Sequence, residues 1–274
     1  MNNVIVRALS GIVYIALIVG SILGGEVYFF LLTTLFSVIG MYEFSQMVHI
    51  GDRFESSYLR VTAIDCLFSA FVPLLAFLSN PATLYLTVLI TYFLVRATIG
   101  LNDLRDHAFR EVMKSITGLI YVSTPLLTLN LLYSSGEKMH ELVLLMFVMI
   151  WLNDTGAFCV GSLLGHRKLC QRLSPKKSWE GFWGGMICCV IFSVVCYNYY
   201  TLNLNIGCWE WVVLGIVISL MSTWGDLFES LLKRTVKVKD SGKLIPGHGG
   251  ILDRIDSLLF VGPTTYIFMQ LIAG

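Results

Sequence analysis

Charge is scarce in this 274-residue sequence: Asp, Glu, Lys and Arg make up 14% of it, whereas 56% of the residues are hydrophobic. A soluble domain carries roughly a quarter charged residues. So little charge cannot cover a water-facing surface, and the composition therefore excludes a soluble globular protein. The formal net charge of +1 gives no indication of a nucleic-acid partner.

Paired cysteine motifs are also missing. The seven cysteines are odd in number, form no C-x-x-C motif and lie mostly in apolar runs. Neither a disulfide framework nor a zinc site fits this spacing. We interpret the cysteines as small hydrophobic residues of the core or of the lipid-facing surface.

Long apolar runs are what the sequence does have. A membrane-spanning helix needs about 20 mostly apolar residues. The run after Arg7 resembles a secretory signal, but it is long, lacks an A-x-A cleavage site and leads into a second run. We predict an all-α polytopic membrane protein with about nine transmembrane helices, at residues 8–24, 27–47, 61–79, 82–100, 116–134, 141–160, 181–200, 209–232 and 255–274.

The distribution of basic residues supports this number of spans, because Lys and Arg near span ends favour the cytoplasmic side. With a cytoplasmic N-terminus, eighteen of the nineteen Lys and Arg residues fall in cytoplasmic segments, and only Lys138 falls outside. A wrong number of spans would destroy this alternation. We divide the chain into spans 1–5, in residues 1–140, and a catalytic transmembrane region with two basic loops, in residues 141–274.

Carboxylates at membrane depth are costly, and each is a functional candidate by default. The candidates are Asp65, Asp154, Asp226 and Glu229, with Asp253 and Asp256 at the start of the last run. Residues three apart share a helix face, as Asp226 and Glu229 do. Mg²⁺ is usually held by one or two carboxylates together with substrate phosphates. We predict Asp226 and Asp253 as metal ligands.

Salt bridges to nearby basic residues are the alternative for these acids. Asp256 also fits the first turn of a helix, where the helix dipole favours an acid. Asp65 lies far from the others in sequence, which favours a structural role. For Glu229 neither interpretation is favoured, and Asp154 fits substrate binding and helix capping equally well.

Two loops have the composition of phosphate-binding segments. The segment 246–250 is rich in glycine, and glycine lets backbone N–H groups approach phosphates. A flexible turn is the alternative, and a single loop histidine such as His248 more often neither binds phosphate nor ligates a cation. The segment 174–181 contains Lys176 and Lys177, which could instead attract anionic lipid. We predict phosphate contact at both loops.

A longer pattern surrounds the glycine-rich segment. Its positions are Ser230, Lys233, Arg234, Lys239, Asp240, Gly242, Pro246, His248, Gly249, Gly250, Asp253, Arg254, Ile255 and Asp256. This pattern resembles the signature of the phosphatidate cytidylyltransferase (CDP-diacylglycerol synthase) family. Residues 154–165, 174–181 and 225–230 also resemble that family, whereas the similarity before about residue 150 is only hydropathic. Phe158 and Ser178 stand where the family pattern has Tyr and Thr; Ser178 keeps the hydroxyl, and we give Phe158 no polar role.

The resemblance implies a reaction of CTP with phosphatidate that gives CDP-diacylglycerol and pyrophosphate for phospholipid synthesis. A phosphomonoester dianion is already a nucleophile, so catalysis requires charge neutralisation and in-line positioning. The predicted catalytic residues are Asp226, Asp253, Asp256, Lys233 and Arg234. The predicted substrate-binding residues are Lys176, Lys177, Ser178, Lys239, His248, Gly249, Gly250, Arg254 and Asp154.

The same interpretation predicts Mg²⁺ as the cofactor and leaves a second cation open. It places the protein in the cell inner (cytoplasmic) membrane, with the active site facing the cytoplasm, and the family favours a homodimer. Three rivals remain: a CTP-dependent enzyme with another lipid acceptor, a transporter with a basic vestibule, and a scaffold that binds anionic lipid. No paired repeat of the transporter kind is found, and a scaffold leaves the aspartates and the glycine-rich turn unexplained.

Overall fold

A computed structural model describes residues 3–49, 56–101, 108–204, 206–242, 244 and 249–273. Helices make up nearly all of the described chain, together with one two-stranded hairpin. Within these residues, eight helical segments are long and apolar enough to cross a membrane, and Leu9–Gly24 is a shorter apolar helix. These segments match the nine predicted runs, which confirms the prediction of an all-α polytopic membrane protein. The sidedness of the two termini stays a prediction.

The chain divides into two compact units. Unit 1 comprises Met1–Leu131 and Val238–Asp253, and unit 2 comprises Leu132–Lys237 and Arg254–Gly274. Most of the glycine-rich signature segment therefore clusters with the N-terminal helices. The division predicted after residue 140 concerns function, whereas these units are defined by packing, so that division stays a prediction.

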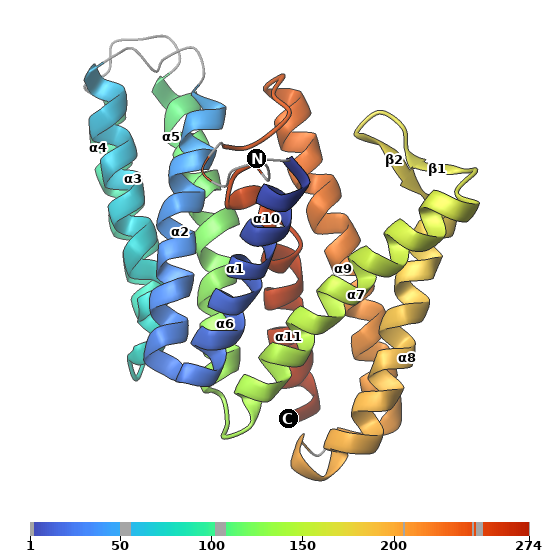
Figure 1. The fold of residues 1–274 in the computed structure, drawn as a ribbon. Coiled ribbons are helices and arrows are strands. Elements are labelled where there is room, and N and C mark those ends of the chain that lie inside the picture. Colours follow the sequence, from blue (N-terminus) through green and yellow to red (C-terminus); the bar gives the residue numbers. More distant parts are fainter. Residues whose placement is uncertain are drawn as a thin grey trace. The chain divides into compact units, whose positions relative to one another are not determined.

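Unit 1 is built mainly of long helices (Figure 1). Their bounds are α1 (Asn3–Gly24), α2 (Glu26–Val48), α3 (Ser56–Leu74), α4 (Pro81–Leu101) and α5 (Ala108–Gly118), and a π-helical segment, η2 (Leu119–Ser123), joins α5 to α6 (Thr124–Ser134). A 3-10 turn, η1 (Leu75–Phe77), follows α3. Helix α4 begins at proline, whose missing N–H would have no intrahelical partner in a first turn in any case.

Buried hydroxyl groups join α2, α3 and η2 inside unit 1. Ser37 and Ser69 lie 2.8 Å apart through their Oγ atoms, and Ser123 Oγ lies 3.0 Å from the first and 2.9 Å from the second. All three side chains are fully buried. Small residues let helix backbones approach closely, and hydroxyls then bond across the contact.

Asp65 on α3 is also fully buried, and its carboxylate is satisfied inside unit 1. Tyr92 on α4 and Ser115 on α5 each donate a hydrogen bond to it at 2.8 Å, and Arg96 Nε lies 3.4 Å away. Arg96 in turn donates to Ser115 Oγ at 2.7 Å. These contacts fit the structural role that its isolated position in the sequence favours.

Unit 2 consists of helices and the hairpin. Its elements are α7 (Met139–Leu164), β1 (Lys168–Cys170), β2 (Ser174–Ser178), α8 (Trp179–Leu204), α9 (Cys208–Thr235) and α11 (Leu258–Ala273), which the short α10 (Leu252–Ile255) precedes. The antiparallel strands pair Lys168 with Ser178 and Cys170 with Ser174. The hairpin lies beyond the adjoining ends of α7 and α8 (Figure 1). The predicted basic loop is therefore an ordered hairpin.

Helices α7 and α8 pack closely through glycines. A Cβ at Gly156 would lie 2.7 Å from Cys188 Sγ, 3.1 Å from the Gly184 carbonyl oxygen and 3.2 Å from Gly185 Cα. Two of these three neighbours are backbone atoms of α8, which cannot turn aside. The close approach therefore depends on the missing side chain.

We expect Gly156→Ala to destabilise the protein by about 1–3 kcal/mol, because overpacking forces the helices apart. The matched control is Gly11→Ala on α1, where an added Cβ meets nothing within 4 Å. There the better helix propensity of alanine should leave stability unchanged or slightly raised. Thermal unfolding of both purified variants in the same detergent measures the difference. Equal midpoints for the two variants would contradict the packing argument.

Candidate functional site

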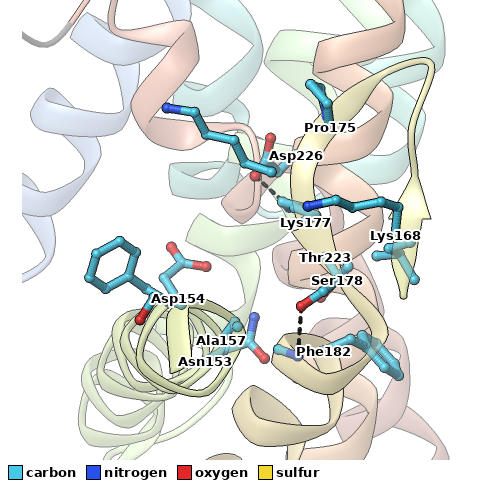
Figure 2. A pocket seen from close by; sticks show the side chains of 16 residues that line it. Asn153, Asp154, Ala157, Lys168, Pro175, Lys177, Ser178, Phe182, Thr223 and Asp226 are labelled. Carbon is cyan, nitrogen blue, oxygen red and sulfur yellow. Dashed lines mark hydrogen bonds and ion pairs between the residues drawn. The ribbon is translucent and has the colours of Figure 1, made fainter. Parts of the chain in front are cut away.

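A cavity of about 500 Å³ lies in unit 2 among α7, α8, α9 and the hairpin. Its lining joins apolar side chains, such as Phe158 and Phe182, to the lysines of the hairpin: Lys168, Lys176 and Lys177. Figure 2 shows Asp154 from α7 and Asp226 from α9 facing this space from separate helices. The cavity can therefore accept a ligand that is anionic on one side and apolar on another.

Two residues of the cavity lining form an ion pair with each other. Lys177 Nζ lies 2.5 Å from Asp226 Oδ2, and both side chains keep about a third of their surface exposed (Figure 2). Solvent screens such a pair, so it contributes little to stability. The geometry instead keeps one cation and one carboxylate in the lining of the cavity, where either can contact a ligand.

A cluster of three acids surrounds this aspartate. Asp226, Glu229 and Asp256 each offer a carboxylate oxygen, and these oxygens all lie within 4.8 Å of one another. Glu229 is only 1% exposed and pairs with Lys233 Nζ at 2.6 Å. Three like charges this close repel one another unless cations compensate them. The cluster therefore has the donor set of a divalent-cation site.

Close packing of α9 brings two of these acids together. A Cβ at Gly225 would lie 2.5 Å from the carbonyl oxygen of Asp256 and 2.9 Å from Ser257 Cα. The backbone after α10 can thus lie directly against α9. This contact places Asp256 next to Asp226, although the two residues are 30 positions apart.

Buried polar contacts fix the helices around the acids. Ser219 Oγ donates to Asn153 Oδ1 at 2.7 Å, and Asn153 Nδ2 donates to Ser222 Oγ at 3.4 Å. Ser257 Oγ donates to the carbonyl oxygen of Ser222 at 3.0 Å. Asn153 and Ser257 are the sequence neighbours of Asp154 and Asp256. These bonds to α9 therefore help to position the carboxylates of α7, of α9 and of the segment after α10.

The hairpin is held at its base by two side chains of the segment 174–181. Ser178 Oγ accepts a hydrogen bond from the N–H of Gly181 at 3.2 Å (Figure 2), as a helix N-cap does. Glu180 accepts hydrogen bonds from the N–H groups of His166 and Arg167 at 3.2 Å. Ser178 is buried, so its hydroxyl has a structural partner as well as a place in the cavity lining.

In unit 1, the described residues of the segment 238–253 (hereafter the signature segment) are hydrogen-bonded around Asp253. Its Oδ2 accepts hydrogen bonds from the N–H of Ser241 at 3.0 Å, from Ser241 Oγ at 3.0 Å and from the N–H of Gly250 at 2.9 Å. Gly249 has φ of 85°, a left-handed conformation that favours glycine. Lys239 is exposed and lines a second cavity of about 760 Å³ in this unit.

The predicted site residues thus fall into two sets. In unit 2, five of them line the first cavity: Asp154, Lys176, Lys177, Ser178 and Asp226. Asp256 belongs to the acid cluster, Lys233 contacts it through Glu229, and Arg234 and Arg254 are exposed on α9 and α10. Unit 1 holds Lys239, Gly249, Gly250 and Asp253. His248 lies outside the described residues, and a metal ion shared by Asp226 and Asp253 stays a prediction.

Several polar residues at these sites were not predicted, and two of them are charged. Lys168 lines the first cavity from β1, and Glu43 of α2 contacts the signature segment. The signal for Glu43 was present in the sequence, since it is an acid within an apolar run. No feature of the sequence distinguished Lys168 from the other basic residues of its loop.

Comparison with known proteins gives the same family throughout. A family model described as "Cytidylyltransferase family" matches residues 5–272. A phosphatidate cytidylyltransferase of Staphylococcus haemolyticus is 31% identical over 269 residues, which cover 96% of this chain and 98% of the relative. The phosphatidate cytidylyltransferase of Staphylococcus saprophyticus is likewise 31% identical over 269 residues, covering 96% and 98%. That of Staphylococcus aureus is 43% identical over 136 residues, about half of each chain.

Proposed function

The chain belongs to the cytidylyltransferase family, and from this premise we infer that it transfers a cytidylyl group from CTP to phosphatidate. The products are CDP-diacylglycerol and pyrophosphate. The relatives that match nearly the whole chain carry the name of this enzyme. The structural observation that best supports the inference is the lysine-lined cavity together with the three-acid cluster, whose Asp226 belongs to the cavity lining.

The chemistry of the substrates explains why such a site is needed. The phosphate of phosphatidate attacks the α-phosphorus of CTP, and both groups are anionic. Bringing them together requires cations and fixed positions more than a strong base. Lys168, Lys176 and Lys177 supply positive charge around the cavity, and its apolar side chains suit the part of a lipid next to the headgroup.

We propose Mg²⁺ as the cofactor, bound at Asp226 with Glu229 and Asp256 beside it. The three carboxylates fit, because Mg²⁺ prefers oxygen ligands and is usually held by one or two carboxylates plus substrate phosphates. When bound, the ion neutralises the triphosphate and polarises the phosphorus that is attacked. With Asp226 engaged by a cation, Lys177, now paired with that carboxylate, would be available to a phosphate oxygen.

The remaining proposals concern location and partners. We place the protein in the cell inner (cytoplasmic) membrane, with the site on the cytoplasmic side, where CTP is available. Support comes from the apolar helices and from the concentration of basic residues on one predicted side. A homodimer is proposed from the family resemblance alone.

We expect the purified protein to release pyrophosphate from CTP and phosphatidate in detergent only when Mg²⁺ is present. Chelation by EDTA should lower the rate about 100-fold or more, because several kcal/mol of charge stabilisation are lost. Unfolding curves with and without Mg²⁺ provide a second readout, since a bound ion raises the midpoint.

Two controls accompany this assay. A panel of other lipid phosphates and lipid alcohols tests the acceptor, and full activity with one of them but none with phosphatidate would contradict the assignment. Uptake of substrate into liposomes without consumption of CTP would instead favour a transporter.

A further inference from the structure

A carboxylate of α2 holds the signature segment from a position about 200 residues earlier in the chain. Glu43 lies in unit 1, one turn before the end of α2, and only 4% of its side chain is exposed. Its partners belong to Val238–Asp253, the segment that clusters with the N-terminal helices. The contact therefore lies wholly within unit 1.

Both oxygens of Glu43 are used as acceptors. Oε1 accepts from the N–H of Ile251 at 3.0 Å, and Oε2 accepts from the N–H of Leu252 at 2.9 Å and from Ser241 Oγ at 3.2 Å. The two amides are consecutive and stand where α10 begins. The side chain thus fixes two points of the segment, Ser241 on one side and the start of α10 on the other.

Ser241 connects this carboxylate to Asp253. Its Oγ lies 3.2 Å from Glu43 Oε2 and 3.0 Å from Asp253 Oδ2. Gly242 and Gly250 pack against the same glutamate so closely that a Cβ on either would collide with its carboxylate. The position of Asp253 therefore depends on Glu43 through a shared hydroxyl and through close packing.

Stability alone does not explain an acid here. Burying a carboxylate is costly even when it is hydrogen-bonded, and an apolar residue would fill the same space in an otherwise apolar helix. Backbone N–H groups that form no hydrogen bond in a buried turn are costly too. The three bonds offset part of both costs and hold Ser241 and residues 251–252 against α2.

We propose that Glu43 is a positioning residue: within unit 1 it fixes Ser241 and residues 249–253, and with them the Asp253 carboxylate that we predict to bind a cation or a substrate phosphate. The proposal rests on the function inferred above. It adds a residue outside the signature, from a helix that carries none of the motifs named in the sequence.

The test uses Glu43→Gln, which keeps the size of the side chain but replaces one acceptor oxygen with a donor. The matched control is Glu26→Gln, an exposed acid on the same helix. Hydrogen exchange of the amides in residues 249–253 should become about tenfold faster or more in Glu43→Gln, and stay unchanged in the control. The Mg²⁺ concentration for half-maximal activity should rise about 10- to 100-fold, as is typical when a group that orients a metal ligand is lost.

Ser241→Ala is the second variant, because it removes the shared hydroxyl without changing α2. It should raise the Mg²⁺ requirement about 3- to 10-fold. Unchanged exchange and Mg²⁺ dependence in both variants would overturn the proposal. So would a Glu43→Gln protein that is merely less stable, with normal exchange in residues 249–253 and normal turnover per folded molecule. If the wild-type protein itself converts no CTP, the inferred function fails, while the exchange comparison still decides whether Glu43 holds the segment.

Discussion

Replacing Asp226 with asparagine is expected to lower pyrophosphate release about 100-fold or more, in the range found when one charge-stabilising group of an active site is removed. The carboxylate stands at the cavity, 2.5 Å from Lys177, and belongs to the three-acid cluster. Asparagine keeps the shape but not the charge. The metal would lose a ligand, and Lys177 would lose the group that now holds its ammonium.

The matched control for Asp226→Asn is Glu210→Gln, in the first turn of the same helix. It should leave turnover unchanged, since it lies about four helical turns from the cluster. The rate from CTP and phosphatidate, together with the Mg²⁺-dependent shift of the unfolding midpoint, measures the effect. Near-normal turnover and a normal Mg²⁺ shift in the Asp226 variant would remove this residue from the metal site.

Asp253→Asn is expected to cost about 100-fold for a related reason. In unit 1 the Asp253 carboxylate accepts two backbone N–H groups and one hydroxyl through a single oxygen. Asparagine retains one carbonyl oxygen that can still accept these bonds. The segment should therefore stay ordered, and the loss of activity should reflect the missing charge.

Hydrogen exchange separates these two effects for Asp253. Residues 249–253 should remain protected in Asp253→Asn, whereas in Ser241→Ala they should lose protection and turnover should fall much less. A fully active Asp253→Asn protein would contradict the assignment of this residue to the cation. Loss of protection together with loss of activity would point to a structural role in its place.

The overall architecture could be predicted from the sequence because the bilayer imposes it. Every backbone polar group in hydrocarbon must bond internally, so apolar runs of sufficient length become helices. The nine predicted runs correspond to helices in the structure, and even the run with π-helical geometry at Leu119–Ser123 continues through α5 and α6. Local geometry of this kind depends on packing and leaves no pattern in the sequence.

Helix ends and short strands were less predictable. The apolar run predicted to end at residue 160 continues as α7 to Leu164, beyond the polar Asn153 and Asp154. Those polar residues are accommodated because α7 faces a cavity and the hydroxyls of α9 there. The strands β1 and β2 pair over a few residues only, too few for an alternating pattern.

The candidate site shows the same division between local and distant information. Asp226 and Glu229 lie on one face of α9, as their spacing of three predicts, and both join the acid cluster. Asp256 joins them because Gly225 has no side chain and the backbone of Asp256 can pack directly against it. This contact is between residues distant in sequence, so no local pattern predicts it. The role of Glu43 has the same origin, since its partners lie beyond residue 240 and only the folded chain shows them.

The buried contacts of Arg96 have a consequence for how the chain enters the membrane during synthesis. An arginine within a lone apolar segment opposes insertion, by roughly 2.5–3.5 kcal/mol at the centre and by less near an end, and Arg96 lies five residues before the end of α4. Asp65, whose carboxylate lies beside this guanidinium, is on the preceding helix and is therefore translated first. When α4 leaves the ribosome, a countercharge already stands in the bilayer, and the two segments can integrate as a pair. The order of Asp65 before Arg96 in the sequence thus favours insertion of the helix that carries the arginine.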